Sequence, residues 1–323
     1  MFERKEKKKP SLRILFASDF HGSNVVFRKF LNAAKMYDAD ALIFGGDITG
    51  KAIIPIVRRS DGTYLTNHFG QQKTLTTEEE LSSFIKIQGN TGYYPMIMDP
   101  SEYEEISANK EKKTELFRRL MFDRVREWIS LANERLRSTG TKLYIEAGND
   151  DFEGIESLFD SDVSTNIGEK ITELDGYKIL GISKANMTPW HAPRDVEEDE
   201  LWKLIEKQIS SVDQNDKVIM AYHPPPIDTN LDLAPKVEKD LSYASSGGQQ
   251  IMVHVGSSSV RKAIEERKPV LSLHGHIHES RGIDRIGKTI CINPGSEYTE
   301  GVLHGALVLL NGNEVLNQIL ITG

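Results

Sequence analysis

Five short apolar segments of the chain each end in a polar cluster, and this pattern constrains the fold more than any other feature. Each segment is typical of a buried β-strand. The segments are 12–17, 41–44, 142–147, 217–221 and 270–273, and the residues that follow them are Asp19, His21, Asp47, Asn149, Asp150, His223, His276 and His278. In open α/β sheets the carboxyl ends of the strands lie along one edge, where ligands bind. The sequence therefore predicts an α/β fold that gathers these side chains at one edge.

Segments with helical spacing alternate with the predicted strands. Apolar residues recur at helical intervals in 24–37 and 195–211, and capping serines open a third helix at 257–267. Alternation of strands with helices predicts parallel pairing. Further strands are predicted at 177–181 and, near the end of the chain, at 282–286, 289–292, 306–310 and 315–321.

The segment from 51 to about 140 interrupts this alternation and is too long for a simple crossover. Asp61-Gly62 predicts a hairpin between strands at 53–59 and 63–69. Thr77 followed by three glutamates predicts a helix start, 89–95 a loop, and 101–138 a long helical region. We expect a cap-like insertion made of a hairpin and helices. The alternative, an elongated crossover packed on the core, accounts for the pattern equally well.

Composition and charge narrow the classes of function. The net charge of −8 and the lack of a basic, aromatic segment argue against a nucleic acid partner. Residues 1–10 hold five basic and two acidic side chains and predict a disordered tail ahead of a domain at 11–323. With no apolar run near the 18 residues of a membrane span and a single cysteine, Cys291, the chain is predicted to be cytoplasmic. Homo-oligomerisation stays open.

The polar residues at the strand ends suit divalent cations. Imidazole, carboxylate and amide ligands accommodate Mn, Fe, Ni or Zn. In Asp19-Phe20-His21 and His276-Ile277-His278 the ligand types are two residues apart, so extended backbone would point both to the same side. Each residue alone is more often a turn or capping residue. Seven such residues in this order along the chain predict a centre with two metal ions, at which a bridging hydroxide can attack phosphorus.

The ordered motifs resemble the calcineurin-like metallophosphoesterase superfamily. The pattern DxH, GD, GN followed by D, a lone H and GHxH covers the chain from Asp19 to His278. Segments 188–190, 223–226, 278–280 and 293–296 are similar to an Icc-related branch of predicted phosphoesterases. The resemblance implies a four-layer α/β/β/α sandwich. It also implies that Asp19, His21 and His278 hold one metal ion, that Asn149, His223 and His276 hold the other, and that Asp47 bridges them.

One position departs from the family pattern. The family has His after the Asn of its GNH motif, where it protonates the leaving group or contacts phosphate, but this chain has Asp150. An aspartate with an ordinary pKa near 3.9 is ionised at neutral pH and donates no proton. We therefore expect activity on phosphodiesters or nucleotide-type substrates with good leaving groups, with Asn149 also contacting substrate. His254, just before a helix start, is a further candidate for phosphate binding, although ordinary serine capping explains the same sequence.

Three functions are compatible with these residues. The first is a metal-dependent hydrolase of small phosphate esters. The second is a scaffold of the same fold that has lost most or all of its activity and binds a protein partner. The third is a nuclease, which the acidic balance of the chain disfavours.

Overall fold

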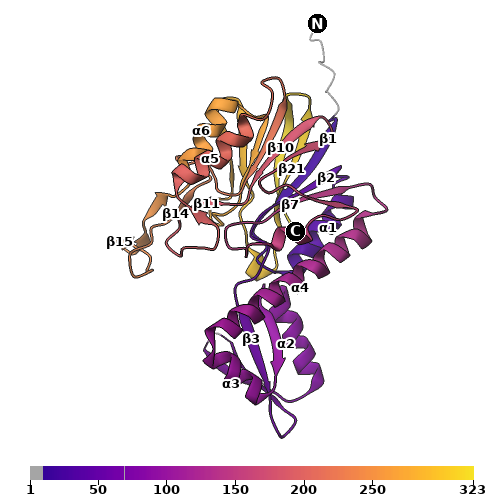
Figure 1. The fold of residues 1–323 in the computed structure, drawn as a ribbon, viewed down its shortest axis with the longest axis vertical. Coiled ribbons are helices and arrows are strands. Elements are labelled where there is room, and N and C mark those ends of the chain that lie inside the picture. The colour runs from indigo at the N-terminus through magenta and orange to yellow at the C-terminus, as the bar shows by residue number, and fades with distance from the viewer. Residues whose placement is uncertain (1–9, 69) are drawn as a thin grey trace.

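Two six-stranded sheets packed face to face form the main body of the protein (Figure 1). The computed structural model describes residues 10–68 and 70–323, so the predicted basic tail, apart from Pro10, lies outside the described residues. Helices cover the outer face of each sheet. The result is the four-layer α/β/β/α sandwich expected from the sequence, with the insertion attached to it.

The first sheet has the order β22-β21-β1-β2-β7-β8. Its strands are β1 (Leu12–Ala17), β2 (Ala41–Gly45), β7 (Lys142–Glu146), β8 (Ser164–Asn166), β21 (His304–Asn311) and β22 (Glu314–Thr322). β1, β2, β7 and β8 run parallel, while β21 pairs antiparallel with β1. Parallel pairing brings the carboxyl ends of β1, β2 and β7 to one edge.

The second sheet has the order β19-β20-β18-β13-β10-β9. Its strands are β9 (Ile171–Leu174), β10 (Tyr177–Ile182), β13 (Lys217–Tyr222), β18 (Leu271–Leu273), β19 (Gly282–Ile286) and β20 (Thr289–Asn293). β10, β13, β18 and β20 are parallel. The strands predicted at 177–181, 217–221, 270–273, 282–286 and 289–292 are therefore confirmed. β8 and β9 are additional strands that the sequence analysis did not predict.

Alternating side chains of β1 show how the layers are held together. Ile14 and Phe16 enter the core between the two sheets, whereas Leu15 and Ala17 face the helices. α1 (Asn24–Met36) and α4 (Lys110–Leu136) cover the first sheet, and α5 (Glu198–Ile209) and α6 (Ser258–Arg267) cover the second. These buried faces account for the helical periodicity in the sequence.

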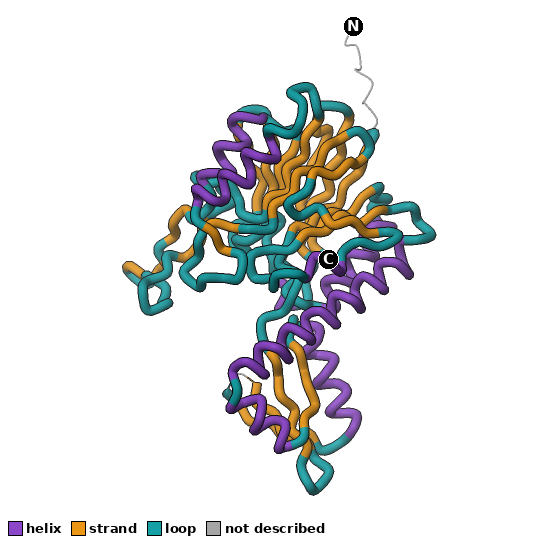
Figure 2. Tube along the Cα trace, viewed as in Figure 1, coloured by secondary structure: helices purple, strands orange, loops and turns teal. Residues whose placement is uncertain are grey.

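The insertion forms a lobe with its own small core (Figures 1 and 2). A four-stranded sheet, β5-β4-β3-β6, consists of β3 (Ile53–Arg58), β4 (Tyr64–His68), β5 (Gln71–Leu75) and β6 (Tyr94–Met98). α2 (Glu78–Asn90), α3 (Pro100–Ala108) and the first turns of α4 complete it. Because α4 continues into the main core, where the ring of Trp128 stacks on that of Phe27 at 4.2 Å, it joins lobe and body.

Local predictions within the lobe are confirmed in part. β3 and β4 form the expected hairpin, and Thr77 caps α2 by accepting a hydrogen bond from Glu80 N. The loop expected at 89–95 is wrong, since α2 runs to Asn90 and β6 begins at Tyr94. The helical region expected at 101–138 is interrupted at Asn109, whose side chain caps α4. β5 and β6 were missed because polar or proline-containing strands lack a strong apolar alternation.

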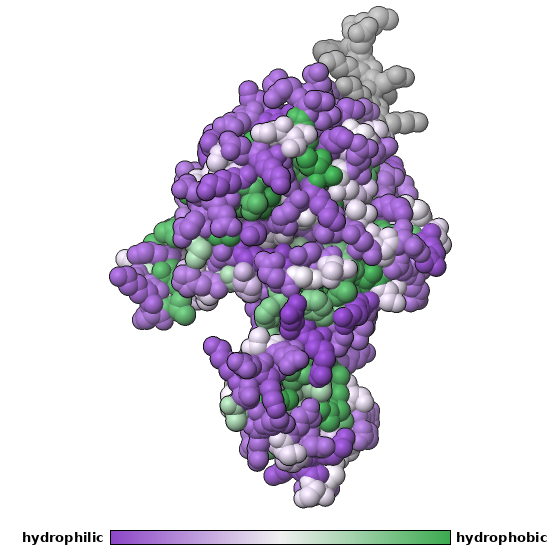
Figure 3. All heavy atoms as spheres, viewed as in Figure 1, coloured by the Kyte–Doolittle hydropathy of each residue, from purple (hydrophilic) through white to green (hydrophobic). Residues whose placement is uncertain are grey.

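Shorter elements surround the sheet edges. They are β11 (Ala185–Asn186), β12 (Asp195–Val196), β14 (Leu233–Pro235), β15 (Ser245–Ser246), β16 (Gln249–Gln250), β17 (Met252–His254) and two 3-10 turns, Ile155–Leu158 and Tyr298–Glu300. β14 to β17 form a protruding arm (Figure 1). Hydrophilic side chains dominate the face drawn in Figure 3. Among the described helices, none combines the length and apolar character required to cross a membrane.

Candidate metal centre

The seven predicted ligands converge at the carboxyl ends of β1, β2, β7, β13 and β18. Ligand atoms of four of them lie within 4.8 Å of one another, and those of a second group of three are equally close. The first group is Asp19, His21, Asp47 and His278, and the second is Asp47, His223 and His276. Asn149 adjoins the second group, since its Oδ1 lies 2.9 Å from His276 Nδ1. Asp47 is common to both groups.

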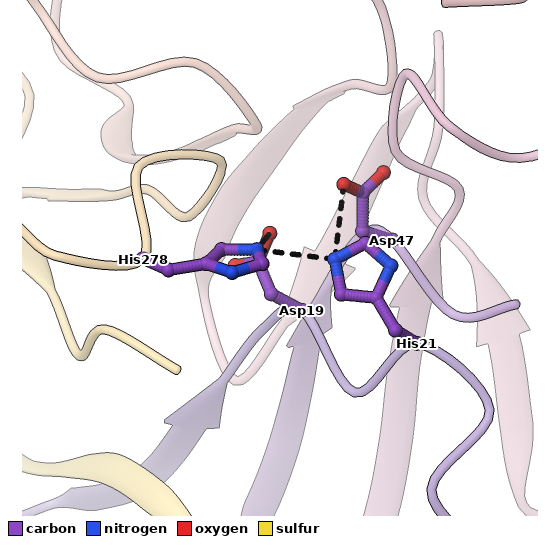
Figure 4. A group of neighbouring side chains, drawn as sticks. All are labelled: Asp19, His21, Asp47 and His278. Carbon is purple, nitrogen blue, oxygen red and sulfur yellow. Dashed lines mark hydrogen bonds and ion pairs between the residues drawn. The ribbon is translucent and has the colours of Figure 1, made fainter. Parts of the chain in front are cut away.

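The first group has the spacing of ligands around one ion (Figure 4). His21 Nε2 lies 3.1 Å from His278 Nε2 and 3.6 Å from Asp47 Oδ2, and His278 Nε2 lies 3.4 Å from Asp19 Oδ1. Two ligands each about 2.1 Å from a cation, at right angles to each other, are about 3.0 Å apart. The donor atoms of this chain therefore fit a cation in the space between them.

In the second group, a hydrogen bond to a backbone carbonyl fixes the orientation of one histidine ring. His223 Nδ1 lies 2.7 Å from the carbonyl oxygen of Gly45, which makes it the protonated nitrogen. Its buried Nε2, without a hydrogen-bond partner among the described residues, lies 3.5 Å from Asp47 Oδ1. A buried ring nitrogen of this kind needs a partner, and a metal ion supplies one.

Tight turns, rather than extended backbone, aim the ligands. Asp19, His21, Asp47 and His276 have φ angles of 59°, 41°, 52° and 67°, in the left-handed region. The expectation that extended backbone points Asp19 and His21 to the same side is therefore wrong, because both follow the last residue of β1. Backbone held in this region by non-glycine residues is concentrated at functional sites. Gly46 is required here, since a Cβ would lie 2.6 Å from His223 Nδ1.

Electrostatics at the centre balance buried imidazoles against buried carboxylates. Burial lowers the pKa of His21, and it lowers the pKa of His276 to about 3, so both rings are neutral. Burial also acts against a charged His223, but Asp47 and Asp19 outweigh it and raise its pKa to about 10. The carboxylates thus attract a positive charge to this position. A divalent cation would satisfy the same carboxylates and release that proton.

Two aspartates that the sequence analysis did not assign to the site hold its loops. Asp195 Oδ1 accepts a hydrogen bond of 2.8 Å from Asn149 Nδ2, which turns the amide oxygen toward His276. The buried carboxylate of Asp151 accepts from the backbone amides of Ile48, Thr49 and Gly148 and from the Thr49 hydroxyl. Asp151 therefore ties the Asp47 loop to the Asn149 loop. The position of Asp151, two residues after Asn149, was its only sequence signal, and Asp195 had none.

Asp150 forms an ion pair at the mouth of the centre. Its Oδ2 lies 3.0 Å from Lys51 Nζ and 3.9 Å from His21 Nδ1. Its backbone amide donates a 3.0 Å hydrogen bond to Asp47 Oδ1. The position where the family has His is therefore occupied by a half-buried carboxylate whose charge is matched by a lysine.

The structure places His254 and His274 outside the two groups. His254 lies on β17, with a side chain 42% exposed and Nδ1 2.8 Å from Asp232 Oδ1. The helix start after it is capped in the ordinary way, because the Ser257 hydroxyl accepts from Val260 N. His274 is buried, with Nδ1 2.8 Å from the carbonyl oxygen of Tyr222.

Comparison with known proteins identifies the family. The model of the calcineurin-like phosphoesterase family matches residues 12–280, which are most of the chain. The protein therefore belongs to the calcineurin-like phosphoesterases. MJ1162, a protein of Methanocaldococcus jannaschii, is 34% identical over 131 residues, which are 40% of this chain and 53% of that protein. The match thus spans about half the length of this relative.

Solved structures share the fold at low sequence identity. TT1561 of Thermus thermophilus gives a TM-score of 0.51 at 14% identity, over 97% of this chain and 98% of that one. Another solved structure gives 0.54 at 15% identity, over 96% and 98%. At such identities the likeness shows the common architecture alone.

Proposed function

We propose that this protein hydrolyses phosphodiesters or nucleotide-type phosphate esters at a centre with two divalent metal ions. The observation that carries the proposal is the sharing of Asp47 by two compact groups of ligand atoms. Asp19, His21 and His278 would hold one ion, and Asn149, His223 and His276 the other, with Asp47 as a ligand shared by both. Imidazole, carboxylate and amide donors suit Mn, Fe, Ni or Zn.

Bound cations would supply a water of lowered pKa and a positive field for the phosphoryl oxygens. The chain's own residues prepare the site for them. The carbonyl oxygen of Gly45 orients His223, and Asp195 orients Asn149. Asp19 accepts hydrogen bonds from the backbone amide of His276 at 3.0 and 3.1 Å, so its carboxylate is held in place. Pre-organised ligands bind metal ions more tightly than mobile ones.

The preference for good leaving groups follows from Asp150. A carboxylate paired with a lysine has no proton to give to a departing alkoxide. A nitrophenolate or a nucleoside phosphate leaves as an anion without such help. If a missing acid limits the rate on poor leaving groups, then Asp150→His should raise that rate, and an unchanged rate would contradict the idea.

The direct test is an assay of the Mn²⁺-loaded protein with three substrates. We expect hydrolysis of bis(4-nitrophenyl) phosphate faster than of 4-nitrophenyl phosphate, and no cleavage of single-stranded DNA. Metal analysis of the same sample should give two ions per chain. Lys236→Met, at a lysine that pairs with Glu238 on the arm, serves as a control for site-directed substitution.

Other outcomes would assign a different function. A metal-loaded protein that hydrolyses none of the three substrates would favour a scaffold that binds a protein partner. Cleavage of single-stranded DNA as the fastest reaction would favour a nuclease. A preference for the monoester would place the protein among phosphomonoesterases.

A further inference from the structure

Lys51 stands at the mouth of the metal centre although nothing in the strand-end pattern selects it. It follows the Asp47 loop directly, at the point where the insertion begins. Its ammonium lies 3.0 Å from Asp150 Oδ2, and its side chain is 50% exposed. The lysine thus faces both the solvent and the carboxylate that replaces the family histidine.

The backbone that carries Lys51 is held on both sides. Ile48 and Thr49 donate their amides to Asp151, and Gly50 N donates a 2.8 Å hydrogen bond to the Tyr94 hydroxyl of the insertion. Gly50 is also packed so closely that a Cβ would lie 1.8 Å from the carbonyl oxygen of Gly92. The position of Lys51 is therefore set by the main body and the insertion together.

Asp150 places the Lys51 ammonium close to the ligands of the first group. The Asp150 Oδ2 that pairs with Lys51 Nζ at 3.0 Å also lies 3.9 Å from His21 Nδ1. The ring of Tyr298 lies 4.7 Å from that of His21. An anion that approaches the metal ligands therefore comes near the Lys51 ammonium.

We infer that Lys51 binds a non-bridging oxygen of the substrate phosphate, and that Asp150 holds the lysine in position for it. The inference rests on the proposed function and names the group that contacts the phosphate at this centre. An ammonium has three donors, so one bond to Asp150 leaves two for phosphate oxygens. Because the Lys51 side chain is 50% exposed, the donors that Asp150 does not use are open to an arriving phosphate.

This arrangement resolves the difficulty raised by Asp150. An unpaired carboxylate beside the centre would repel a phosphate, whereas a carboxylate neutralised by Lys51 does not. Lys51 thus provides the positive charge that binds phosphate, a role the family histidine can fill, while Asp150 provides no proton to the leaving group. Strong binding of phosphate and slow expulsion of poor leaving groups follow together.

The test measures inorganic phosphate rather than turnover alone. Its dissociation constant with the Mn²⁺-loaded protein is determined by calorimetry, and its inhibition constant by assay. Lys51→Met should weaken phosphate binding at least about tenfold, the loss typical of one charge-assisted hydrogen bond, and should raise KM more than it lowers kcat. Lys51→Arg should restore most of the affinity. Metal content should stay at the wild-type value in both variants.

Lys236 offers a matched control. Its ammonium also lies 3.0 Å from a carboxylate, that of Glu238, and its side chain is 48% exposed, but it lies on the arm. Lys236→Met should leave phosphate affinity unchanged. If Lys51→Met also leaves the phosphate affinity unchanged, or if it loses metal along with phosphate, the inference is overturned.

A double variant tests the role given to Asp150. In Lys51→Met the carboxylate is left without its partner and repels phosphate, so adding Asp150→Asn should recover part of the lost affinity. A further loss instead would show that Asp150 acts independently of Lys51. Failure of the proposed function has a different outcome, because a wild-type protein that binds phosphate through Lys51 but hydrolyses no ester retains the inference and refutes the proposal.

Discussion

His21 Nε2 and His278 Nε2 lie 3.1 Å apart, although 257 residues separate them in the chain. Burial favours neutral imidazole at His21, and a neutral ring directs a lone pair from its unprotonated nitrogen. Two ring nitrogens that face each other beside Asp19 and Asp47 are close enough to share a cation (Figure 4). The surrounding contacts hold these ligands in place.

Removal of metal should destabilise the protein as well as inactivate it. A cation present at about 100 times its dissociation constant stabilises the folded state by about 2.7 kcal/mol. We therefore expect EDTA to abolish hydrolysis and to lower Tm by about 5 °C, with Mn²⁺ restoring both. Calorimetric or fluorescence melting with and without EDTA measures the shift. An identical Tm in the two conditions would argue against a metal centre built from these residues.

Asp47→Asn should affect both groups of ligands at once. The substitution keeps the shape of the side chain and an oxygen that can accept the hydrogen bond from Asp150 N. It removes the charge shared by the two groups, so we expect fewer than two bound ions and a fall in kcat of at least about 100-fold. Metal analysis and steady-state kinetics check this. Two ions still bound at full activity would exclude a bridging role.

Asp195→Asn should weaken metal binding from outside the ligand set. Its carboxylate orients the amide of Asn149 and also accepts from Thr188 N and Ala192 N. Loss of such a supporting hydrogen bond typically lowers metal affinity by about 10- to 100-fold. Competition with a chelator of known affinity measures the change. Unaltered metal affinity would mean that packing alone positions Asn149.

Glu146 should make the stability of the metal-free protein depend on pH. It is fully buried, and burial raises its pKa well above the ordinary value of 4.5, an effect that His223 only partly offsets. Because the folded pKa is the higher one, the stabilisation is complete below about pH 4.5 and is lost as the pH rises through the folded pKa. From pH 5 to pH 8, wild type should lose more unfolding free energy than Glu146→Gln.

Urea denaturation in EDTA at several pH values tests this prediction. Comparison with the glutamine variant cancels the contributions of the other titrating groups. Parallel pH profiles for the two proteins would show that Glu146 is ionised in the folded state.

Gly50→Ala should disturb the junction between the insertion and the centre. A Cβ at this position would lie 1.8 Å from the carbonyl oxygen of Gly92, so either the Asp47 loop or the insertion must move. Because small displacements of positioning groups can cost about 100-fold in rate, we expect a loss of that order. Gly282→Ala is a control, since its nearest atom is the flexible Leu231 Cδ2 at 3.2 Å. Normal kinetics of Gly50→Ala would show that the junction tolerates the shift.

Much of the sandwich could be predicted because its signals are local. Buried strands such as β2 are short apolar runs, and α1 carries its apolar face at helical spacing. The insertion was predicted less well. β5 is largely exposed and polar, and β6 contains Pro95, so neither shows the alternation that identifies a strand. These strands are fixed by pairing within the lobe.

The residues of the candidate site also fall into those that the sequence identified and those that it missed. Asp19, His21 and Asp47 were identified because they follow apolar strands, and family motifs strengthened the assignment. Asp195 and Lys51 were missed, since a single aspartate or lysine in a loop has no sequence pattern of its own. Only the approach of separate loops shows that one orients Asn149 and the other pairs with Asp150.

The sequence by itself determined which chemical groups this protein brings to the carboxyl edge of its sheets. Residue type and strand position are properties of neighbours along the chain, so they can be recognised without a fold. The tertiary structure decided which nitrogen faces which oxygen, as in the left-handed turn that aims His276 and the pairing of His21 with His278. Those relations depend on strand order and turn geometry between distant segments, which no local pattern encodes.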